Sequence, residues 1–184
     1  MPDKDLTGES IEIMGGKEVM MAPASFVHNG ISLNLASIIR AYLRGKKCKV
    51  RQDIYVQFDE NWRLAPDIVI VCNPEQIRKG QIYGAPDFIA EILSISTEKN
   101  DLSVKKDVYE RFGVKEYWII DPKKKSITVY LLKDGKYELD NIYYSYTQEE
   151  WEDLTEDEQA RQKLSLKLSL YDDLEIKVND VFEE

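Results

Sequence analysis

The chain has few of the residues that build common metal and redox sites: one histidine and two cysteines among 184 residues. A zinc centre built from several such ligands is therefore excluded. Apolar runs stay short of the roughly 20 residues that a membrane-spanning helix needs. The opening MPDKDLTGES lacks the basic and apolar regions of a signal peptide. The chain also lacks a glycine-rich phosphate loop, a dinucleotide fingerprint and a nucleophile elbow. We expect a cytoplasmic protein outside these enzyme classes.

The two cysteines, Cys48 and Cys72, lie in unrelated contexts and have no metal-ligand spacing. In a reducing cytoplasm such residues are normally thiols. We predict that both are buried or bystander thiols.

Charge is distributed unevenly along the chain. The net charge is −9, which taken alone argues against a nucleic-acid partner. Residues 1–140, however, hold 21 acidic and 21 basic residues, whereas residues 141–184 hold 13 acidic and 4 basic ones. The neutral body carries basic clusters, including 46-KKCKVR-51, in which Lys46, Lys47 and Arg51 are candidates for DNA binding. Each such cluster is more often a solvated loop.

Hydrophobic periodicity predicts a single α/β domain spanning residues 1–184, with 43% hydrophobic residues to form its core. An N-terminal β-hairpin is expected around Gly15-Gly16. An acidic helical insert is expected at about 145–163, where Thr147 to Glu150 and Thr155 to Glu158 match capping boxes. The strand–helix–strand order of residues 86–121 indicates a crossover connection within an α/β core. The expected helices cover 26–45 and 100–113, and the expected strands cover 49–58, 67–72, 86–94, 117–121, 126–132 and 165–170.

The segment 86-PDFIAEILS-94 places Glu91 among apolar residues on both alternating faces. A carboxylate there is costly unless it is paired, protonated or bound to a metal. Asp67 opens another apolar strand, 67-DIVIVC-72. If the two strands are neighbours, both carboxylates can converge, and such hard oxygen ligands suit Mg²⁺ or Mn²⁺. Glu91 can alternatively be a structural ion-pair partner of Arg51 or Lys105, and Asp67 can belong to a simple turn after Pro66.

Val104, Val108 and Phe112 form the expected apolar stripe of helix 100–113, and Lys105 lies one residue past Val104 at the border of this stripe. Its stem can run along the core while its ammonium reaches the sheet, where it can hold a water or stabilise charge on a phosphate. Tyr109 lies one turn further along the same border and is a candidate hydrogen-bond donor behind the site.

Other polar residues near these segments have simpler explanations. Asp101 is a candidate neighbour of the site, and alternatively it can form an ordinary surface pair with Lys105. For His28, a capping or core role is favoured over catalysis. From residues and spacing alone, a glycosidase carboxylate pair fits almost as well as a metal site.

The segments 66-PDIVIV-71, 84-GAPDFIAEILSIST-97 and 101-DLSVKKDVYERFGVKEYWIIDP-122 resemble the Uma2 family of endonucleases, which belongs to the restriction-endonuclease-like superfamily. The segments 12-EIMGG-16, 20-MMAPASFVHNGI-31 and 170-LYDDLEIKVNDVF-182 are similar to the family's beginning and end. The resemblance covers most of the chain. It implies a restriction-endonuclease-like core, in which helices flank a central mixed sheet.

The resemblance also implies that Asp67 and Glu91 bind the metal. The superfamily usually places a lysine two residues after the second acid, where this chain has Leu93, so Lys105 looks like its substitute. Glu12 and His28 match recurrent positions near the family's N-terminus. The expectation is a Mg²⁺- or Mn²⁺-dependent endonuclease that acts on DNA as a homodimer. The alternative is a catalytically silent member that acts as a DNA- or protein-binding module.

Overall fold

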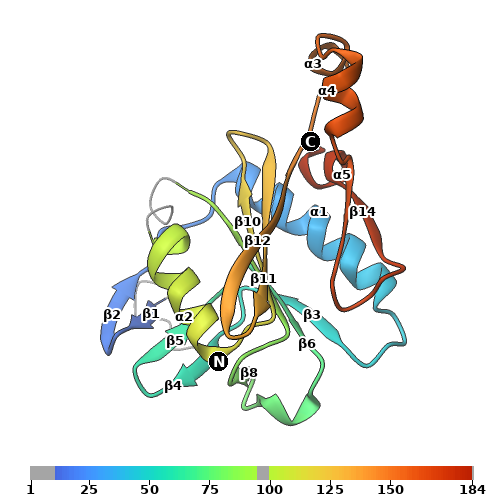
Figure 1. Ribbon diagram of the computed structural model, residues 1–184. Helices are drawn as coiled ribbons and strands as arrows, with labels where there is room; N and C mark the ends of the chain where they lie inside the picture. The colour runs from blue at the N-terminus through green and yellow to red at the C-terminus, as the bar shows by residue number, and fades with distance from the viewer. Residues whose placement is uncertain (1–10, 95–99, 184) are drawn as a thin grey trace.

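The computed structural model describes residues 11–94 and 100–183, which form two six-stranded sheets, a short hairpin and flanking helices (Figure 1). The central sheet has the strand order β12 (Lys136–Tyr144), β11 (Ser126–Lys133), β10 (Glu116–Asp121), β9 (Phe88–Ile92), β6 (Ile68–Val71), β3 (Lys49–Gln52). The N-terminal sheet has the order β2 (Lys17–Met20), β1 (Ile11–Met14), β5 (Trp62–Leu64), β4 (Val56–Asp59), β8 (Gln81–Tyr83), β7 (Ile77–Arg78). The predicted mixed α/β architecture with an N-terminal hairpin is confirmed.

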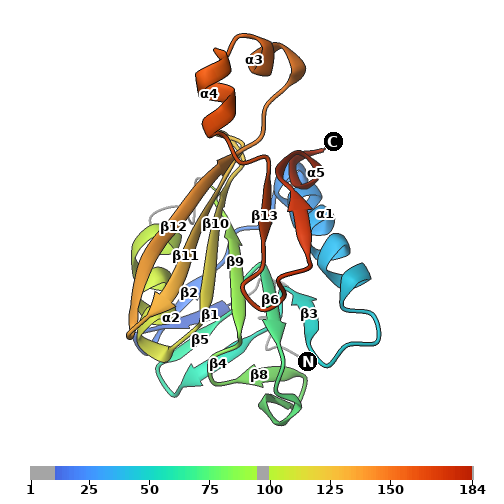
Figure 2. The ribbon, with the colours of Figure 1, turned by 45° about the vertical axis from the view of Figure 1, so that its right-hand side comes forward.

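The central sheet is covered on both faces, as its apolar strands predict. One face packs against α1 (Phe26–Tyr42), the hairpin β13 (Ser165–Lys167) and β14 (Glu175–Lys177), and α5 (Val178–Phe182). The other face packs against α2 (Lys106–Phe112) and strands of the N-terminal sheet. Figure 2 shows α1 and α2 on opposite sides of the strands. Successive residues of β9 therefore enter different cores, and Glu91 points to the side of α2.

Helix α1 begins as its sequence predicts. The Ser25 side chain accepts a hydrogen bond from the His28 amide and caps the first turn. Ile31, Leu35 and Ile39 form the buried stripe. The helix ends at Tyr42, just before Gly45, which has a positive φ of 78°. Its first turn therefore lies against the central sheet with His28 buried.

The single strand expected at 49–58 is wrong, because this segment supplies two strands to different sheets. Strand β3 ends at Gln52 in the central sheet, and β4 begins at Val56 in the N-terminal sheet. Asp53 breaks the extended backbone with a φ of 48°, in the left-handed region. Its amide donates to the Asp67 carbonyl. The break therefore lies beside the start of β6.

The helix expected at 100–113 forms as a π-helical segment, η2 (Asn100–Lys105), followed by α2 and ended by Gly113 with a φ of 88°. The predicted apolar stripe is wrong at Val104, which is 37% exposed, whereas Lys105 is 1% exposed. The wider π-helical turn changes which side chains face inward. It directs the lysine, rather than the valine, toward the core.

The acidic insert forms two short helices, α3 (Gln148–Glu152) and α4 (Glu156–Arg161), joined to the ends of β12 and β13. Both capping boxes are present, at Thr147 with Glu150 and at Thr155 with Glu158. The helices project away from the sheets (Figures 1 and 2). No residue of either helix is buried.

Buried Glu116 attaches the C-terminal segment to the central sheet. Its Oε1 accepts a hydrogen bond from Trp118 Nε1 at 2.7 Å. Its Oε2 accepts from the amide and the hydroxyl of Ser169, at 2.8 and 2.6 Å. Burial raises the pKa of the Glu116 carboxyl, although these hydrogen bonds oppose the shift. The sequence analysis missed this residue, since a glutamate at a strand start reads as exposed.

The prediction that Cys48 and Cys72 are thiols is wrong, because they form a disulfide. Strands β3 and β6 are antiparallel, and their register pairs Lys49 with Val71. The next positions along both strands are the two cysteines, which therefore face each other. The cysteines no longer support the expectation of a reducing cytoplasm. In the described part of the chain, no helix is long and apolar enough to cross a membrane.

Candidate metal and phosphodiester site

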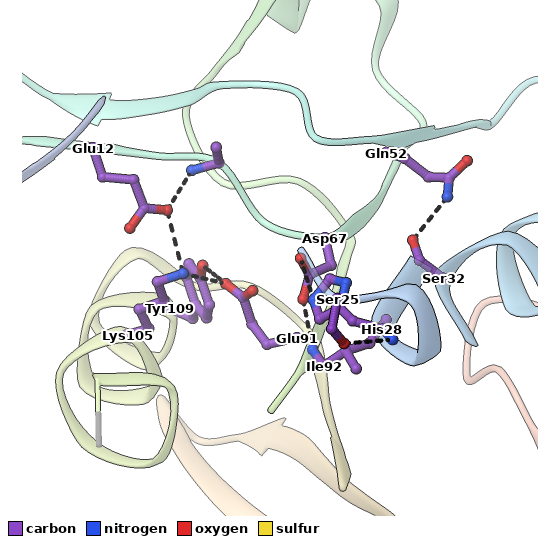
Figure 3. A network of polar contacts seen from close by, with 11 residues as sticks. Glu12, Ser25, His28, Ser32, Gln52, Asp67, Glu91, Ile92, Lys105 and Tyr109 are labelled. Carbon is purple, nitrogen blue, oxygen red and sulfur yellow. Dashed lines mark hydrogen bonds and ion pairs between the residues drawn. The ribbon is translucent and has the colours of Figure 1, made fainter. Parts of the chain in front are cut away.

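Asp67 and Glu91 come from adjacent antiparallel strands of the central sheet. The register pairs Ile68 with Ala90, which places Asp67 opposite Glu91. Asp67 Oδ2 also accepts a hydrogen bond from the Ile92 amide at 2.6 Å. Figure 3 shows the two side chains next to each other, with Glu91 reaching toward α2 and Asp67 reaching toward α1. Two acids that are 24 residues apart in sequence thus meet at one strand end.

Glu91 makes close contacts with two side chains of the helical segment that follows it. Lys105 Nζ lies 3.1 Å from Glu91 Oε1, and the Tyr109 hydroxyl donates to the same oxygen at 2.6 Å. All three side chains are nearly inaccessible to solvent, with at most 2% exposure. Burial and the neighbouring Glu91 charge raise the pKa of Tyr109 well above its ordinary value. Tyr109 is therefore a neutral hydrogen-bond donor near neutral pH.

Glu12 reaches the same cluster from β1 in the N-terminal sheet (Figure 3). Its Oε1 lies 3.2 Å from Lys105 Nζ and accepts a hydrogen bond from the Ala65 amide at 2.8 Å. Its Oε2 is buried and has no hydrogen-bond partner within the described residues. Two buried carboxylates thus share one ammonium, which leaves the cluster with a formal excess of one negative charge.

His28 contacts the other acid. Its Nε2 lies 3.1 Å from Asp67 Oδ1, so α1 supplies a neighbour for Asp67 just as η2 supplies one for Glu91. Asp53 also lies close by. Its pKa is raised first by partial burial and then by the like charge of Asp67, while His28 opposes the shift. The sequence analysis did not find Asp53, because it appeared to lie inside one strand.

Six of the predicted site residues fall in this network: Glu12, His28, Asp67, Glu91, Lys105 and Tyr109. The side chain of Asp101 lies outside the described part of the chain.

The three predicted DNA-binding residues lie elsewhere and do not form one group. The Lys46 ammonium stacks on the rings of Tyr42 and Tyr171, at 4.1 and 5.3 Å from their centroids. Lys47 lines a shallow pocket beside Cys72, and Arg51 lines a different pocket beside Cys48.

The chemistry of the donor set fits a hard divalent cation. Carboxylate oxygens are the ligands that Mg²⁺ and Mn²⁺ prefer, and the unpartnered Glu12 oxygen adds a buried acceptor. Across residues 11–94 and 100–183, no three His, Cys, Asp or Glu side chains converge on one metal position. Lys105 instead contacts Glu91 Oε1. Asp67 and Glu91 are therefore chemically suitable ligands for a metal. In this structure the Lys105 ammonium neutralises Glu91.

Comparison with solved structures identifies the fold. The crystal structure of "a putative nuclease belonging to DUF820" from Anabaena variabilis ATCC 29413 superimposes with a TM-score of 0.71. The match covers 94% of this chain and 89% of that one, at 18% sequence identity. An identity this low shows the fold alone. The chain therefore has the fold of a nuclease-like α/β protein.

The family model described as "Uma2: Putative restriction endonuclease" matches residues 1–173. The chain belongs to the Uma2 family. The uncharacterised protein slr1290 of Synechocystis sp. is 26% identical over 130 residues, which cover 68% of each chain. The resemblance noted in the sequence is confirmed at the level of the family.

Proposed function

We propose that the protein is a Mg²⁺- or Mn²⁺-dependent endonuclease that hydrolyses phosphodiester bonds of DNA. The observation that supports this best is the pairing of Asp67 and Glu91 across adjacent strands, with Lys105 against Glu91. A structural carboxylate needs one partner, whereas here two acids lie on adjacent strands and a buried lysine contacts one of them. Family membership is consistent with the same chemistry.

In this proposal Asp67 and Glu91 would hold the cation, which would polarise the phosphodiester and lower the pKa of a bound water. The protein's own residues prepare the site. His28 orients Asp67, and Tyr109 fixes the rotation of the Glu91 carboxylate. Lys105 would donate hydrogen bonds to a phosphoryl oxygen or to the attacking water, where its charge offsets the negative charge that develops. Glu12 holds the lysine from the opposite side.

One observation favours a second candidate, a catalytically silent binding module. The Lys105 ammonium already lies between Glu12 and Glu91, at 3.2 and 3.1 Å. A lysine that is held between two buried carboxylates can stabilise the fold without taking part in catalysis. The two candidates differ in their response to metal, since ligand binding stabilises the native state only where a site exists.

Cleavage of supercoiled plasmid in Mg²⁺ or Mn²⁺ tests the proposal, with Glu91→Gln and Asp67→Asn as the test variants. The matched control is Glu138→Gln, which changes an exposed glutamate of β12. We expect metal-dependent nicking by the native protein and by the control, and none by the test variants. Millimolar Mn²⁺ should also raise the melting temperature of the native protein but not that of Glu91→Gln. Absence of both nicking and the thermal shift would reject the nuclease in favour of the binding module.

A further inference from the structure

A basic pocket lies where the C-terminal end of α1 meets the edge strand β3. Four cationic side chains line it: Arg40, Arg44, Lys49 and Arg51. Its volume is about 310 Å³, and its other lining residues are uncharged. All four cationic residues are exposed. We refer to this cluster as the α1–β3 basic face.

The cations of this face differ from four exposed lysines elsewhere in the body. Lys115, Lys124, Lys133 and Lys136 each form an ion pair with an aspartate or glutamate. Within the described residues, none of the four cations on the α1–β3 basic face has an acidic partner within 4.0 Å. The face therefore concentrates four unneutralised positive charges on a chain whose net charge is −9. The net negative charge of the chain repels an anionic ligand at long range, whereas this face attracts such a ligand locally.

Both elements that build this face also reach the candidate site. Helix α1 carries His28 in its first turn and Arg40 in its last, and Figure 2 shows α1 and β3 running side by side. Strand β3 leads from Lys49 to Asp53, whose amide bonds to the Asp67 carbonyl. Four residues of strand span about 13 Å, and 12 residues of helix span about 18 Å. At about 3.4 Å of rise per nucleotide, these lengths correspond to roughly four or five nucleotides.

We propose that the α1–β3 basic face binds the phosphodiester backbone of a nucleic acid, about four or five nucleotides from the bond held at Asp67 and Glu91. Three of the four cations are arginines, whose planar guanidinium groups can each form two hydrogen bonds to a phosphate. The open pocket suits a continuous backbone better than an isolated small anion. The inference rests on the proposed function only for the second contact of the nucleic acid, at Asp67 and Glu91. The acidic helices α3 and α4 project from the end of the molecule away from β3 (Figures 1 and 2).

The structural alternative is that these charges protect an edge strand. Lysine and arginine on an exposed edge discourage pairing with other strands, and β3 has a neighbour on one side only. Protection of an edge needs no nucleic acid, so binding measurements separate the two roles.

The test is duplex binding by fluorescence anisotropy between about 50 and 200 mM NaCl. Glu91→Gln serves as the background with EDTA present, so that cleavage plays no part. In that background, one variant changes Arg40, Arg44, Lys49 and Arg51 to Gln. The matched control changes Lys115, Lys124, Lys133 and Lys136 to Gln, which removes the same charge from cations that are already paired. Circular dichroism and melting temperature establish that each variant folds.

We expect the slope of log K against log salt to fall in magnitude by about 0.9 for each lost phosphate contact, hence by up to about 3.6. Affinity near 100 mM salt should drop at least about tenfold, while the control stays within about twofold. Unchanged affinity and slope in the test variant would overturn the inference, as would no binding of any duplex or single strand by the background protein at low salt.

Two outcomes separate this inference from the nuclease proposal. Binding that depends on the face, in a native protein that never nicks plasmid, would reject the nuclease and keep the face. Nicking that is unaffected by the four glutamines would reject the face and keep the nuclease. A changed sedimentation coefficient with unchanged DNA binding would instead assign the face to contacts between copies of the chain, and would overturn the inference.

Discussion

Lys105 Nζ lies 3.1 Å from Glu91 Oε1, and both side chains are almost completely buried. The lysine comes from a π-helical segment and the glutamate from the middle of the central sheet. These contacts explain why Glu91 is tolerated in an apolar strand. The Lys105 ammonium and the Tyr109 hydroxyl compensate for the lost hydration of its carboxylate. The same contacts make the pair sensitive to the removal of any one partner.

Lys105→Met should destabilise the protein by about 3–5 kcal/mol at neutral pH, because Glu12 and Glu91 would be left buried without their cation. Urea unfolding monitored by circular dichroism measures this change. Adding Glu12→Gln to Lys105→Met should restore part of the loss, since one unpaired carboxylate disappears. The control is Lys136→Met, which breaks an exposed ion pair and should cost no more than about 1 kcal/mol. A loss below that of the control would contradict the description of Lys105 as a buried ion-pair partner.

Tyr109→Phe should reduce stability by about 1.5–3 kcal/mol, the usual contribution of a hydrogen bond to a charged group. The ring packing against Phe58 and Tyr117 is retained, so the effect isolates the hydroxyl. If the nuclease proposal holds, nicking should fall more than stability does, because the Glu91 carboxylate would be free to rotate. Tyr143→Phe, at a buried tyrosine in the other core, is the matched control. Equal losses in the two variants would argue against a specific role for the Tyr109 hydroxyl.

Glu116→Gln tests the pH dependence that burial imposes. Because the folded pKa of Glu116 is raised, its contribution to stability is fully present below the unfolded value of about 4.3 and is lost as pH rises through the folded pKa. The stability of the native protein relative to Glu116→Gln should therefore decrease between about pH 4 and the raised pKa, then level off. Urea unfolding at several pH values measures the difference, with Glu138→Gln as the exposed-site comparison. A difference that grows with pH would show that the hydrogen bonds outweigh burial.

Reduction of the Cys48–Cys72 disulfide should lower the free energy of unfolding by about 3 kcal/mol, as expected for a crosslink that closes a loop of this size, with a sequence separation of 24. Thermal melts with and without dithiothreitol measure the effect. The double variant Cys48→Ser/Cys72→Ser should melt near the reduced protein and should not respond to the reductant. Identical melts of the native protein in both conditions would show that the crosslink does not contribute to stability.

Much of the candidate site was predictable because its acids conflict with their surroundings. Glu91 interrupts an apolar strand, so the hydrophobic pattern alone distinguishes it, whereas Asp67 after Pro66 also fits a simple turn. Lys105 was predictable only as a residue at the border of its helix, because the π-helical turn that buries it has no recognisable sequence pattern. The capping boxes were predicted correctly since they are local hydrogen-bonding patterns.

Features set by tertiary contacts escaped the sequence analysis. The break at Asp53 is accompanied by a hydrogen bond to the distant Asp67 carbonyl, and a single aspartate is a weak turn signal in the sequence. The disulfide depends on the register of β3 against β6, which spacing along the chain does not reveal. The α1–β3 basic face was only partly anticipated, because Arg40 at the end of α1 and Arg44 in the turn after it join Lys49 and Arg51 through packing.

Glu12 gives the N-terminal hairpin a role that its small size conceals. The residue connects β1 to Lys105 and, through it, to Glu91 in the central sheet. The cluster thus exists only after segments far apart in the chain have docked, and contacts of such long sequence separation form slowly. In a nascent or partly unfolded chain, Glu12 and Glu91 would not yet lie close together. The cluster around Glu91 is therefore complete only when the N-terminal hairpin has docked on the central sheet.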